Sequence, residues 1–428
     1  MSSNKKKGAR DKMKTKGVRL YGENDLRLEE FELPKINDDE ILARVVTDSI
    51  CMSSYKAAIQ GAKHKRVPKD VDKNPIIIGH EMCGEIIEVG KKYKDRYKKG
   101  QRFTMQTNLN HPSNIYAAPG YSFRYTGGTI QNMIIAKEVL EVDCLLEYNG
   151  DSFYQGSLAE PVSCIIGAFS AMYHTNRVNY EHTMGIKEGG KMAILAGVGP
   201  MGLGAIDYAV NQERKPSLLV VTDIDDSRLA RAAEIFSPQW AAEHGVKLIY
   251  LNTGKTEDPV KSLMELSDNK GYDDVFVFAP VKPVVEQGDK ILGYDGCLNF
   301  FAGPTDPTFS ATFNFYNVHY NSTHIVGTSG GNTDDMKKCI TMCEEGKLNP
   351  AAMVTHIGGL DSAAEATLNL PKIPGGKKLI YTGISMPLTA ISDFEEKGYP
   401  ELAKICNANK GLWCKQAEDW LLKNSTKI

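Results

Sequence analysis

The sequence contains no uninterrupted apolar stretch of about 18 residues, the length that a membrane-spanning helix requires. It also has little net charge, because 51 lysines and arginines are matched by 53 aspartates and glutamates. That balance gives no overall attraction to nucleic acid or to an acidic membrane. The residues after Met1 are rich in lysine rather than apolar, so we expect no signal peptide.

Cysteine is too sparse for a fold stabilised by disulfides. The chain has 9 cysteines in 428 residues, an odd number scattered without regular spacing. We therefore expect a protein of the reducing cytoplasm rather than a secreted one. With 42% hydrophobic and 24% charged residues, the composition is that of a globular protein, and its length predicts two or three domains.

The first 17 residues are the exception to the balanced charge. They carry seven lysines and arginines against one acid, Asp11. We predict a disordered, solvated extension over residues 1–17, and an arm that binds a polyanion is the alternative. Met13 is a candidate internal start, because a strand-like pattern begins just after it.

The pattern of the chain changes near Leu158. Before it, short strand-like runs separated by glycine-containing turns are typical of a small barrel; the runs cover residues 40–48, 85–90, 99–103 and 128–136. After it, apolar strands alternate with helices, which predicts a parallel sheet covered on both faces. These strands are expected at residues 191–196, 218–223, 246–251, 274–278, 296–301 and 324–328, and the clearest helices at 202–210 and 227–235.

The alternation of strands and helices stops near residue 330. A late strand at residues 379–383 is placed to rejoin the first domain. The tail, residues 386–428, has a helical pattern, and we expect it to pack on the surface.

A glycine-rich turn follows the first of the apolar strands. Gly197 permits the tight turn, Gly199 lets the backbone approach a pyrophosphate, and Gly202 lets the next helix pack closely on the strand. Pro200 and Met201 open that helix, whose N-terminal amides then face the phosphates. The turn, in this strand–turn–helix context, predicts a dinucleotide site.

The strand after this turn ends in Asp223, 21 residues beyond Gly202. A carboxylate there accepts hydrogen bonds from a ribose 2′-hydroxyl and repels a 2′-phosphate, which favours NAD over NADP. Arg228, five residues further on, keeps NADP as the alternative.

Candidate zinc ligands are scattered through the first region: Cys51, His80, Glu81 and Glu160. A thiolate, an imidazole and a carboxylate suit Zn²⁺, and three protein ligands leave a position open for a substrate. The ligands are spread over more than 100 residues, so their spacing alone does not establish a site. Taken singly, Cys51 is also compatible with a buried structural thiol and Glu160 with a surface carboxylate.

Together these motifs resemble the zinc-dependent medium-chain alcohol and polyol dehydrogenase family. The resemblance is carried by residues 79–85 (GHEMCGE), Cys51, the pair Glu160-Pro161 and the dinucleotide turn. It implies an α/β fold with a GroES-like catalytic β-barrel and a Rossmann domain, a doubly wound parallel sheet. The implied boundaries place the barrel at residues 18–165 and 330–428, including the tail, and the Rossmann domain at residues 166–329.

The same resemblance implies a zinc ion held by Cys51, His80 and Glu160. In the polyol branch of the family a Glu supplements the Cys and His ligands. Glu81 is implied as a second or exchanging ligand, or as a residue that orients the site. Relatives form dimers or tetramers, often by joining the edge strands of their Rossmann sheets. The strand at residues 297–301 and the segment around Tyr320 are candidates for that contact.

Longer stretches resemble the reductases that interconvert L-sorbose 1-phosphate and glucitol 6-phosphate. These stretches are residues 49–56, 64–68, 118–125, 158–169 and 199–209. The resemblance implies hydride transfer between a nicotinamide cofactor and a ketose phosphate or polyol phosphate. An enzyme of sorbitol, threonine, butanediol or another secondary alcohol is the alternative, and a non-catalytic dinucleotide-binding scaffold is a third reading.

The sequence departs from the wider family in two places. No cysteine lies between Cys83 and Cys144, so a four-cysteine structural zinc site cannot be built there, and we predict one zinc per chain. Lys56 stands where relatives commonly carry a histidine that ends a proton relay, while Ser53 keeps the hydroxyl position. We predict that Ser53 passes the proton and that Lys56 either replaces the histidine or binds an anionic substrate.

A phosphorylated substrate requires cationic groups. Candidates are Lys56, Lys65, Arg66 and Arg124, since arginine offers a bidentate fork for phosphate and lysine a point charge. The alternative for each of them is a solvated surface charge. We expect a small sugar or polyol phosphate as partner, and neither nucleic acid nor a membrane.

Overall fold

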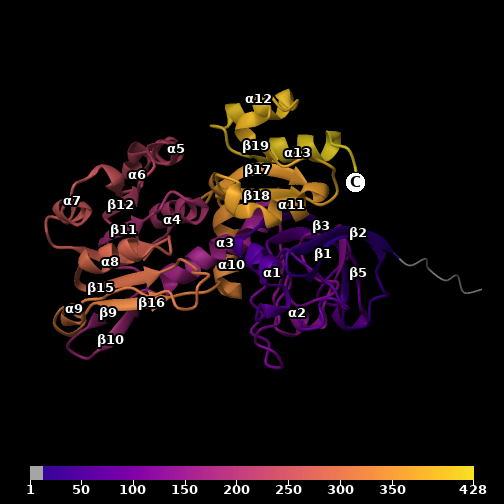
Figure 1. Cartoon of the computed structure of the whole chain (residues 1–428), viewed down its shortest axis with the longest axis horizontal. Helices are drawn as coiled ribbons and strands as arrows, with labels where there is room; N and C mark the ends of the chain where they lie inside the picture. The colour runs from indigo at the N-terminus through magenta and orange to yellow at the C-terminus, as the bar shows by residue number, and fades with distance from the viewer. Residues whose placement is uncertain (1–12) are drawn as a thin grey trace, which may run out of the picture.

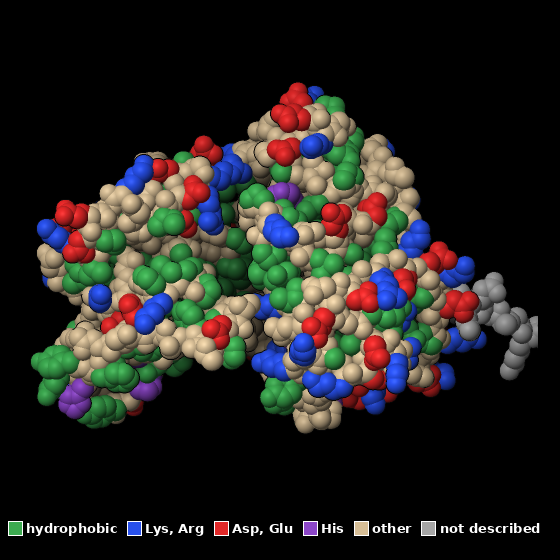
Figure 2. Space-filling view, viewed as in Figure 1, with side chains coloured by type: hydrophobic (Ala, Val, Ile, Leu, Met, Phe, Trp, Pro, Cys, Tyr) green, Lys and Arg blue, Asp and Glu red, His purple; other side chains and the backbone are tan. Residues whose placement is uncertain are grey.

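The computed structural model describes residues 13–428. Two large sheets form two lobes, and helices α3 (Phe153–Ser170) and α10 (Thr333–Glu344) lie between them (Figure 1). A hollow separates the lobes on the face that Figure 2 shows. No helix in the described part of the chain has the length and apolar character needed to cross a bilayer.

The first lobe is built on an eight-stranded sheet in the order β19-β17-β18-β3-β5-β6-β8, with β7 also pairing with β3. Its strands are β3 (Ile41–Ile50), β5 (Met82–Val89), β6 (Arg102–Met105), β7 (Asn132–Ile135), β8 (Leu145–Glu147), β17 (Val354–Gly359), β18 (Lys377–Tyr381) and β19 (Thr389–Ala390). The late strand β18 runs antiparallel to β3, with Leu379 opposite Ser49. Residues far apart in sequence therefore meet on two neighbouring strands.

A smaller sheet and several helices complete this lobe. The sheet has the order β2-β1-β4, with β1 (Lys14–Gly22), β2 (Asp25–Glu32) and β4 (Ile76–Ile77). The helices are α1 (Met52–Gln60), α2 (Lys137–Glu141) and α11 (Ala363–Leu368).

The second lobe is a six-stranded parallel sheet in the order β13-β12-β11-β14-β15-β16, which is the doubly wound arrangement. The strands are β11 (Lys191–Leu195), β12 (Leu218–Asp223), β13 (Lys247–Asn252), β14 (Tyr272–Val277), β15 (Leu292–Phe300) and β16 (His324–Gly327). The helices are α4 (Pro200–Asn211), α5 (Asp226–Ile235), α6 (Pro238–Glu243), α7 (Pro259–Leu266), α8 (Lys282–Lys290) and α9 (Phe315–Tyr320). The predicted α/β fold class is confirmed. The domain boundaries at residues 165 and 330 stay predictions, and α3 runs through the first of them.

The prediction for the N-terminus is wrong over its last residues. Lys14 to Gly17 are the start of β1, and they pair with the acidic end of β2. Lysines alternate there with Thr15, which is buried, and Lys14 Nζ lies 3.0 Å from Glu30 Oε1. Exposed and buried residues alternate along this segment, and its lysines face the acidic residues of β2. These two features favour a strand, although the composition of the segment suggests disorder. The rest of the predicted extension, residues 1–12, lies outside the described residues.

The tail is helical as predicted, with α12 (Pro400–Ala408) and α13 (Lys415–Asn424), but it does more than cover the surface. Trp413 and Leu421 are fully buried, and they share a core cluster with Tyr154 and Leu158 of α3 and Leu379 of β18. The tail therefore packs with its polar faces exposed, while the apolar faces of both helices enter the core.

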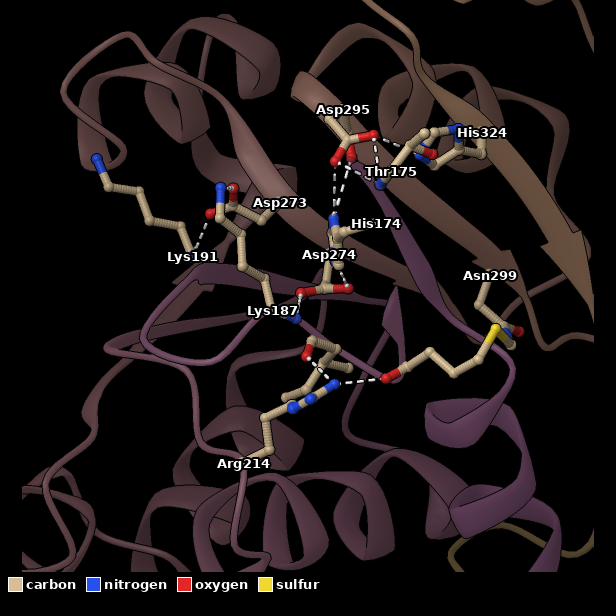
Figure 3. Close-up of polar contacts among 12 residues, drawn as sticks. His174, Thr175, Lys187, Lys191, Arg214, Asp273, Asp274, Asp295, Asn299 and His324 are labelled. Carbon is tan, nitrogen blue, oxygen red and sulfur yellow. Dashed lines mark hydrogen bonds and ion pairs between the residues drawn. The ribbon is translucent and has the colours of Figure 1, made fainter. Parts of the chain in front are cut away.

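A short hairpin, β9 (Tyr173–Asn176) and β10 (Glu181–Met184), projects beside the parallel sheet (Figure 1). A polar network ties it to β14 and β15 (Figure 3). His174 Nε2 lies 3.1 Å from Asp274 Oδ1, and His174 Nδ1 lies 3.1 Å from the carbonyl oxygen of Asp295. His324 Nε2 in turn lies 2.9 Å from Asp295 Oδ1. The hairpin is thus tied to the parallel sheet by hydrogen bonds to β14 and β15.

Candidate metal and cofactor site

Three of the candidate zinc ligands meet in the first lobe. Cys51 precedes helix α1, and His80 and Glu81 lie between β4 and β5. One potential ligand atom from each of these residues lies within 4.8 Å of the others. His80 and Glu81 are buried, and Cys51 is partly exposed. Segments about 30 residues apart therefore place a sulfur, a nitrogen and an oxygen around one point.

The turn before His80 requires glycine. Gly79 has a φ of 87°, a conformation that L side chains rarely adopt. A Cβ there would also lie 2.0 Å from Asp48 Oδ2 and 2.3 Å from Thr129 Oγ1. The backbone therefore reaches His80 in a conformation that no other residue could keep without displacing its neighbours.

Hydroxyl groups surround the imidazole of His80. Ser54 Oγ lies 3.1 Å from Nδ1, while Ser53 Oγ and Tyr121 Oη lie 3.2 and 3.3 Å from Nε2. Ser53 Oγ also lies 3.0 Å from Cys51 Sγ. The contact at Nδ1 orients the ring so that Nε2 faces Cys51, and Ser53 stands between the two.

Both carboxylate oxygens of Glu81 already have donors. Ser49 Oγ donates to Oε2, and the Nζ of Lys377, on β18, donates to Oε1. Although burial opposes the charge on Lys377, the charges of Glu81 and Cys51 outweigh it and raise the pKa of this ammonium. Glu81 is therefore better arranged to orient the site than to coordinate a metal.

Sequence reasoning missed Lys377. Lys377 lies in strand β18, which is buried along its whole length. A lysine is almost never buried without a partner of opposite charge, and this is the signal that could have pointed to it.

Glu160 is different, because its carboxylate has no such donors. It lies on α3 with 7% of its surface exposed. Within residues 13–428 no N–H or O–H group donates to the carboxylate, and its contact is the thiol of Cys164 at 3.9 Å. Burial raises the pKa of Glu160 to about 7, and the charge of His80 lowers it, as expected for side chains close together. A buried carboxylate without a donor is costly unless a cation compensates it.

These residues fit a zinc ion. Cys51, His80 and Glu160 supply a thiolate, an imidazole and a carboxylate, the donor set that Zn²⁺ accepts. Burial raises the pKa of the Cys51 thiol, and the nearby Lys377 ammonium lowers it. A bound cation would likewise favour the thiolate.

Of the predicted phosphate-binding residues, Arg66 is joined to this site through Tyr121. Its guanidinium lies 5.4 Å from the centre of the Tyr121 ring, and one of its nitrogens donates to Asn108 Oδ1 at 3.2 Å. Burial, and then the charges of nearby cationic side chains with Arg66 first, lower the pKa of the neighbouring His64 to about 4. The surroundings of Tyr121 are therefore rich in positive charge.

The other predicted cations lie differently. Lys65 and Arg124 are exposed and lie over the rings of Tyr116 and Tyr125, at 5.7 and 5.5 Å from the ring centres. Lys56 reaches across to the second lobe, where its Nζ donates to the carbonyl oxygen of Gly303 at 2.7 Å. Burial lowers the pKa of Lys56.

The glycine-rich turn lies at the C-terminal end of β11. Gly199 precedes α4, with Pro200 at the first position of the helix. A Cβ on Gly202 would lie 2.1 Å from the carbonyl oxygen of Gly197, so this close approach excludes any side chain. Met201 packs against the core of the lobe. The free amides at the start of α4 are thus available to a phosphate.

Asp223 and Arg228 flank this turn. Asp223, at the end of β12, accepts hydrogen bonds from the backbone N–H groups of Ile224 and Asp225 at 2.9 and 3.3 Å. Arg228 is exposed, and one of its guanidinium nitrogens would lie 3.5 Å from a Cβ on Gly199. A carboxylate and a guanidinium therefore both lie near the place that a ribose and its phosphates would take.

The chain belongs to the zinc-binding dehydrogenase family. The family model described as zinc-binding dehydrogenase matches residues 200–345, and the alcohol dehydrogenase GroES-like domain matches residues 37–143. The family implies an alcohol or polyol oxidoreductase that uses zinc and a nicotinamide cofactor.

Several relatives match almost the whole chain, and two of them are named for an activity. The mannitol-1-phosphate 5-dehydrogenase of Aliivibrio fischeri is 51% identical over 94% of this chain and 96% of its own. The L-sorbose 1-phosphate reductase of Klebsiella pneumoniae is 49% identical over 97% of this chain and 98% of its own. Among solved structures, the 2R,3R-butanediol dehydrogenase of Bacillus subtilis has the same fold, with a TM-score of 0.68 at 22% identity over 86% of this chain and 99% of its own.

Proposed function

We propose that this chain interconverts a ketose phosphate and a polyol phosphate with a nicotinamide cofactor. L-sorbose 1-phosphate and glucitol 6-phosphate are the first pair to test, and mannitol 1-phosphate is the second candidate because one relative is named for it. The observation that carries the proposal is the contact from Arg66 through Tyr121 to His80, which places a cation beside the candidate metal ligands.

In this proposal Cys51, His80 and Glu160 hold one zinc ion per chain. Zinc supplies Lewis-acid chemistry, which polarises a ketone and lowers the pKa of an alcohol. Glu81, held by Ser49 and Lys377, keeps the site in position.

Ser53 passes the proton between the substrate oxygen and solvent, because its hydroxyl lies 3.0 Å from Cys51 Sγ and 3.2 Å from His80 Nε2. Lys56, whose pKa is lowered by burial, is the candidate for the outer proton acceptor or for an anion-binding group. Hydride moves between the substrate carbon and the nicotinamide, and the protein contributes position and electrostatics.

The cofactor binds at the turn from Gly197 to Gly202. We favour NAD, because the Asp223 carboxylate is placed for a ribose hydroxyl, while Arg228 keeps NADP as the alternative. The ratio of kcat/KM for NADH and NADPH decides between them. The Asp223→Ser variant is expected to shift that ratio toward NADPH.

The test of the substrate class is an initial-rate assay of NADH oxidation with L-sorbose 1-phosphate and L-sorbose in parallel, and of NAD reduction with mannitol 1-phosphate. We expect Arg66→Ala to raise KM for the phosphate by roughly 10- to 100-fold, the value of one or two charge-assisted hydrogen bonds. KM for the unphosphorylated sugar is expected to stay within about twofold. Arg124→Ala is the matched variant at an exposed arginine. Equal losses on both sugars would remove the phosphate-binding role.

We also propose a homo-oligomer that forms through the edge of the parallel sheet. Strand β16 ends the strand order, and exposed apolar residues gather around it and the β9–β10 hairpin, at the lower left of Figure 2. They are Val178, Tyr180, Met184, Tyr294, Phe315, Tyr316, Tyr320 and Ile325. A contiguous apolar patch of this kind is typical of an interaction site. Sedimentation analysis is expected to show a dimer or larger species for the parent and a smaller one for Ile325→Asp.

The compartment we propose is the cytoplasm. All nine cysteines are free thiols, and six of them are buried. Free thiols in this number persist in a reducing environment. The full set of thiols should be titratable with a thiol reagent after unfolding without a reductant.

A further inference from the structure

The start of helix α3 is held by a residue from the far end of the chain. Ser152, which precedes the helix, makes no side-chain hydrogen bond to the helix backbone. Instead, the N–H of Phe153 donates to Glu418 Oε2 at 2.7 Å, and the N–H of Tyr154 donates to Glu418 Oε1 at 2.9 Å. The first N–H groups of a helix have no partners within the helix, and a carboxylate both satisfies them and complements the helix dipole.

Glu418 is itself fixed by buried partners. Its side chain is 1% exposed, and Tyr381 Oη donates to its Oε1 at 2.8 Å. Trp413 Nε1 donates in turn to Tyr381 Oη at 2.8 Å. Burial raises the pKa of Glu418 to about 7, although these hydrogen bonds act in the opposite direction. The Glu418 carboxyl group, which α13 carries, is thereby held between Tyr381 of β18 and the first turn of α3.

The first two turns of α3 carry Glu160. From Phe153 to Glu160 is seven residues, about 10 Å along a helix axis. Pro161 follows directly, and because proline has no N–H it removes the hydrogen bond to the carbonyl of Ser157. With one hydrogen bond fewer inside the helix, the position of residues 153–160 depends more strongly on contacts with the rest of the protein than it would in an uninterrupted helix.

Those contacts come from two directions. On the barrel side, Thr47 Oγ1 donates to the carbonyl of Phe153 at 3.1 Å, and Thr104 Oγ1 donates to that of Gly156 at 2.7 Å. On the tail side, Tyr154 and Leu158 belong to the buried cluster that contains Trp413 and Leu421. The tail therefore contributes both a polar and an apolar anchor to the segment.

We propose that Glu418 is a positioning residue for the metal site, which it serves by fixing the start of α3 and through it the carboxylate of Glu160. The tail is then part of the active-site architecture although it does not touch the reacting atoms. This inference rests on the ligand role that the proposed function gives to Glu160.

Cobalt substitution tests the proposal in the full-length chain. Zn²⁺ is d¹⁰ and has no d–d spectrum, whereas the visible bands of Co²⁺ report the number and geometry of its ligands. Four variants are compared with the parent: Glu418→Gln, Glu418→Ala, Glu160→Gln and Leu421→Ala. Leu421→Ala is the matched control, because it removes a buried side chain of the same helix and weakens the apolar anchor, while the two hydrogen bonds from the α3 backbone to Glu418 remain. Thermal unfolding measures the stability of each variant.

We expect Glu418→Gln to change the Co²⁺ spectrum and to weaken metal binding by roughly tenfold, the usual effect of losing a supporting contact. Glutamine accepts through one oxygen, so one of the two helix N–H groups loses its acceptor. We expect kcat to fall by about 10-fold or more while the Kd for the cofactor stays unchanged, since small displacements of a reacting site are costly. Leu421→Ala is expected to lower the melting temperature and to keep the parental spectrum and metal affinity.

The outcomes separate this inference from the function it rests on. If Glu160→Gln alters the spectrum and both Glu418 variants keep that of the parent, the positioning role is overturned and the proposed ligand stands. If Glu160→Gln leaves the spectrum and the metal affinity unchanged, the ligand role fails and the inference fails with it. If Leu421→Ala reproduces the change at equal loss of stability, the effect is general destabilisation and Glu418 has no specific role. Should Glu418→Ala not fold, Glu418→Gln alone decides.

Discussion

Each lobe of this chain contains a buried cluster of histidine and carboxylate groups, and the two clusters differ in how completely their polar atoms are paired. In the hairpin cluster of the second lobe, both ring nitrogens of His174 have partners (Figure 3). Asp274 also accepts from the N–H of Lys187 at 2.9 Å, and Asp295 accepts from the N–H of Thr175 and from His324. Every acceptor in this cluster has a donor from within the protein.

The cluster of the first lobe is not closed in this way. Glu81, which is paired with Ser49 and Lys377, meets Cys51 and His80 with potential ligand atoms within 4.8 Å of one another. The charges of His80 and Cys51 also act on the buried carboxylate of Glu160. Within the described chain, the Glu160 carboxylate receives no hydrogen bond from an N–H or O–H group, and its contact is the thiol of Cys164. A closed network of polar groups stabilises a fold, whereas a buried carboxylate without an N–H or O–H donor is costly unless a cation compensates it. The hairpin cluster of the second lobe therefore has a structural role, and the cluster of the first lobe is suited to binding.

Removing a proposed ligand should have the largest effect. We expect Cys51→Ala to lose its zinc, as measured by elemental analysis, and to lower kcat/KM by at least about a thousandfold, since Lewis-acid stabilisation is worth several kcal/mol. Asp295→Asn, in the closed cluster, is the matched variant and should keep both the zinc and the rate at 25 °C. A Cys51→Ala protein with one zinc per chain and the parental rate would contradict the assigned site.

The buried ion pair should give the next largest effect. Lys377→Met leaves the Glu81 carboxylate buried and unpaired, so we expect a loss of about 3–5 kcal/mol in the free energy of unfolding, measured by urea denaturation. The double variant Lys377→Met/Glu81→Gln should recover most of that loss, because it removes the unpaired charge. Lys187→Met is the comparison in the second lobe, where Lys187 and Asp273 form an exposed pair 2.6 Å apart. It should cost less than about 1 kcal/mol. Equal losses from the two lysine variants would mean that Lys377 is not held as a buried charge.

Local patterns predicted much of the fold and part of the site. The glycine turn between β11 and α4 and the aspartate at the end of β12 follow from short sequence signals, since strand, turn and helix are contiguous there. Lys377 and Glu418 were missed because their partners are 296 and 265 residues away in sequence. The resemblance singled out His80, but the residues alone could not show which side chains surround it or that both ring nitrogens of His174 are paired, because only the fold brings those partners together.

Titration of the closed cluster should give the smallest effect and a defined sign. Burial lowers the pKa of His174, but the hydrogen bond to Asp274 and the charges of Asp274 and Asp295 outweigh it, so the folded pKa lies above the ordinary value of 6.5. The stabilisation from its charge is therefore complete below pH 6.5 and is lost as the pH rises through the folded pKa. At pH 6 we expect His174→Gln to have a free energy of unfolding about 1–2 kcal/mol below that of the parent, measured by thermal unfolding. This difference in stability should become smaller toward pH 8.5. A gap that widens with pH would mean that the neutral imidazole is the stabilising form, and the cluster would then be held by ordinary hydrogen bonds rather than by charge.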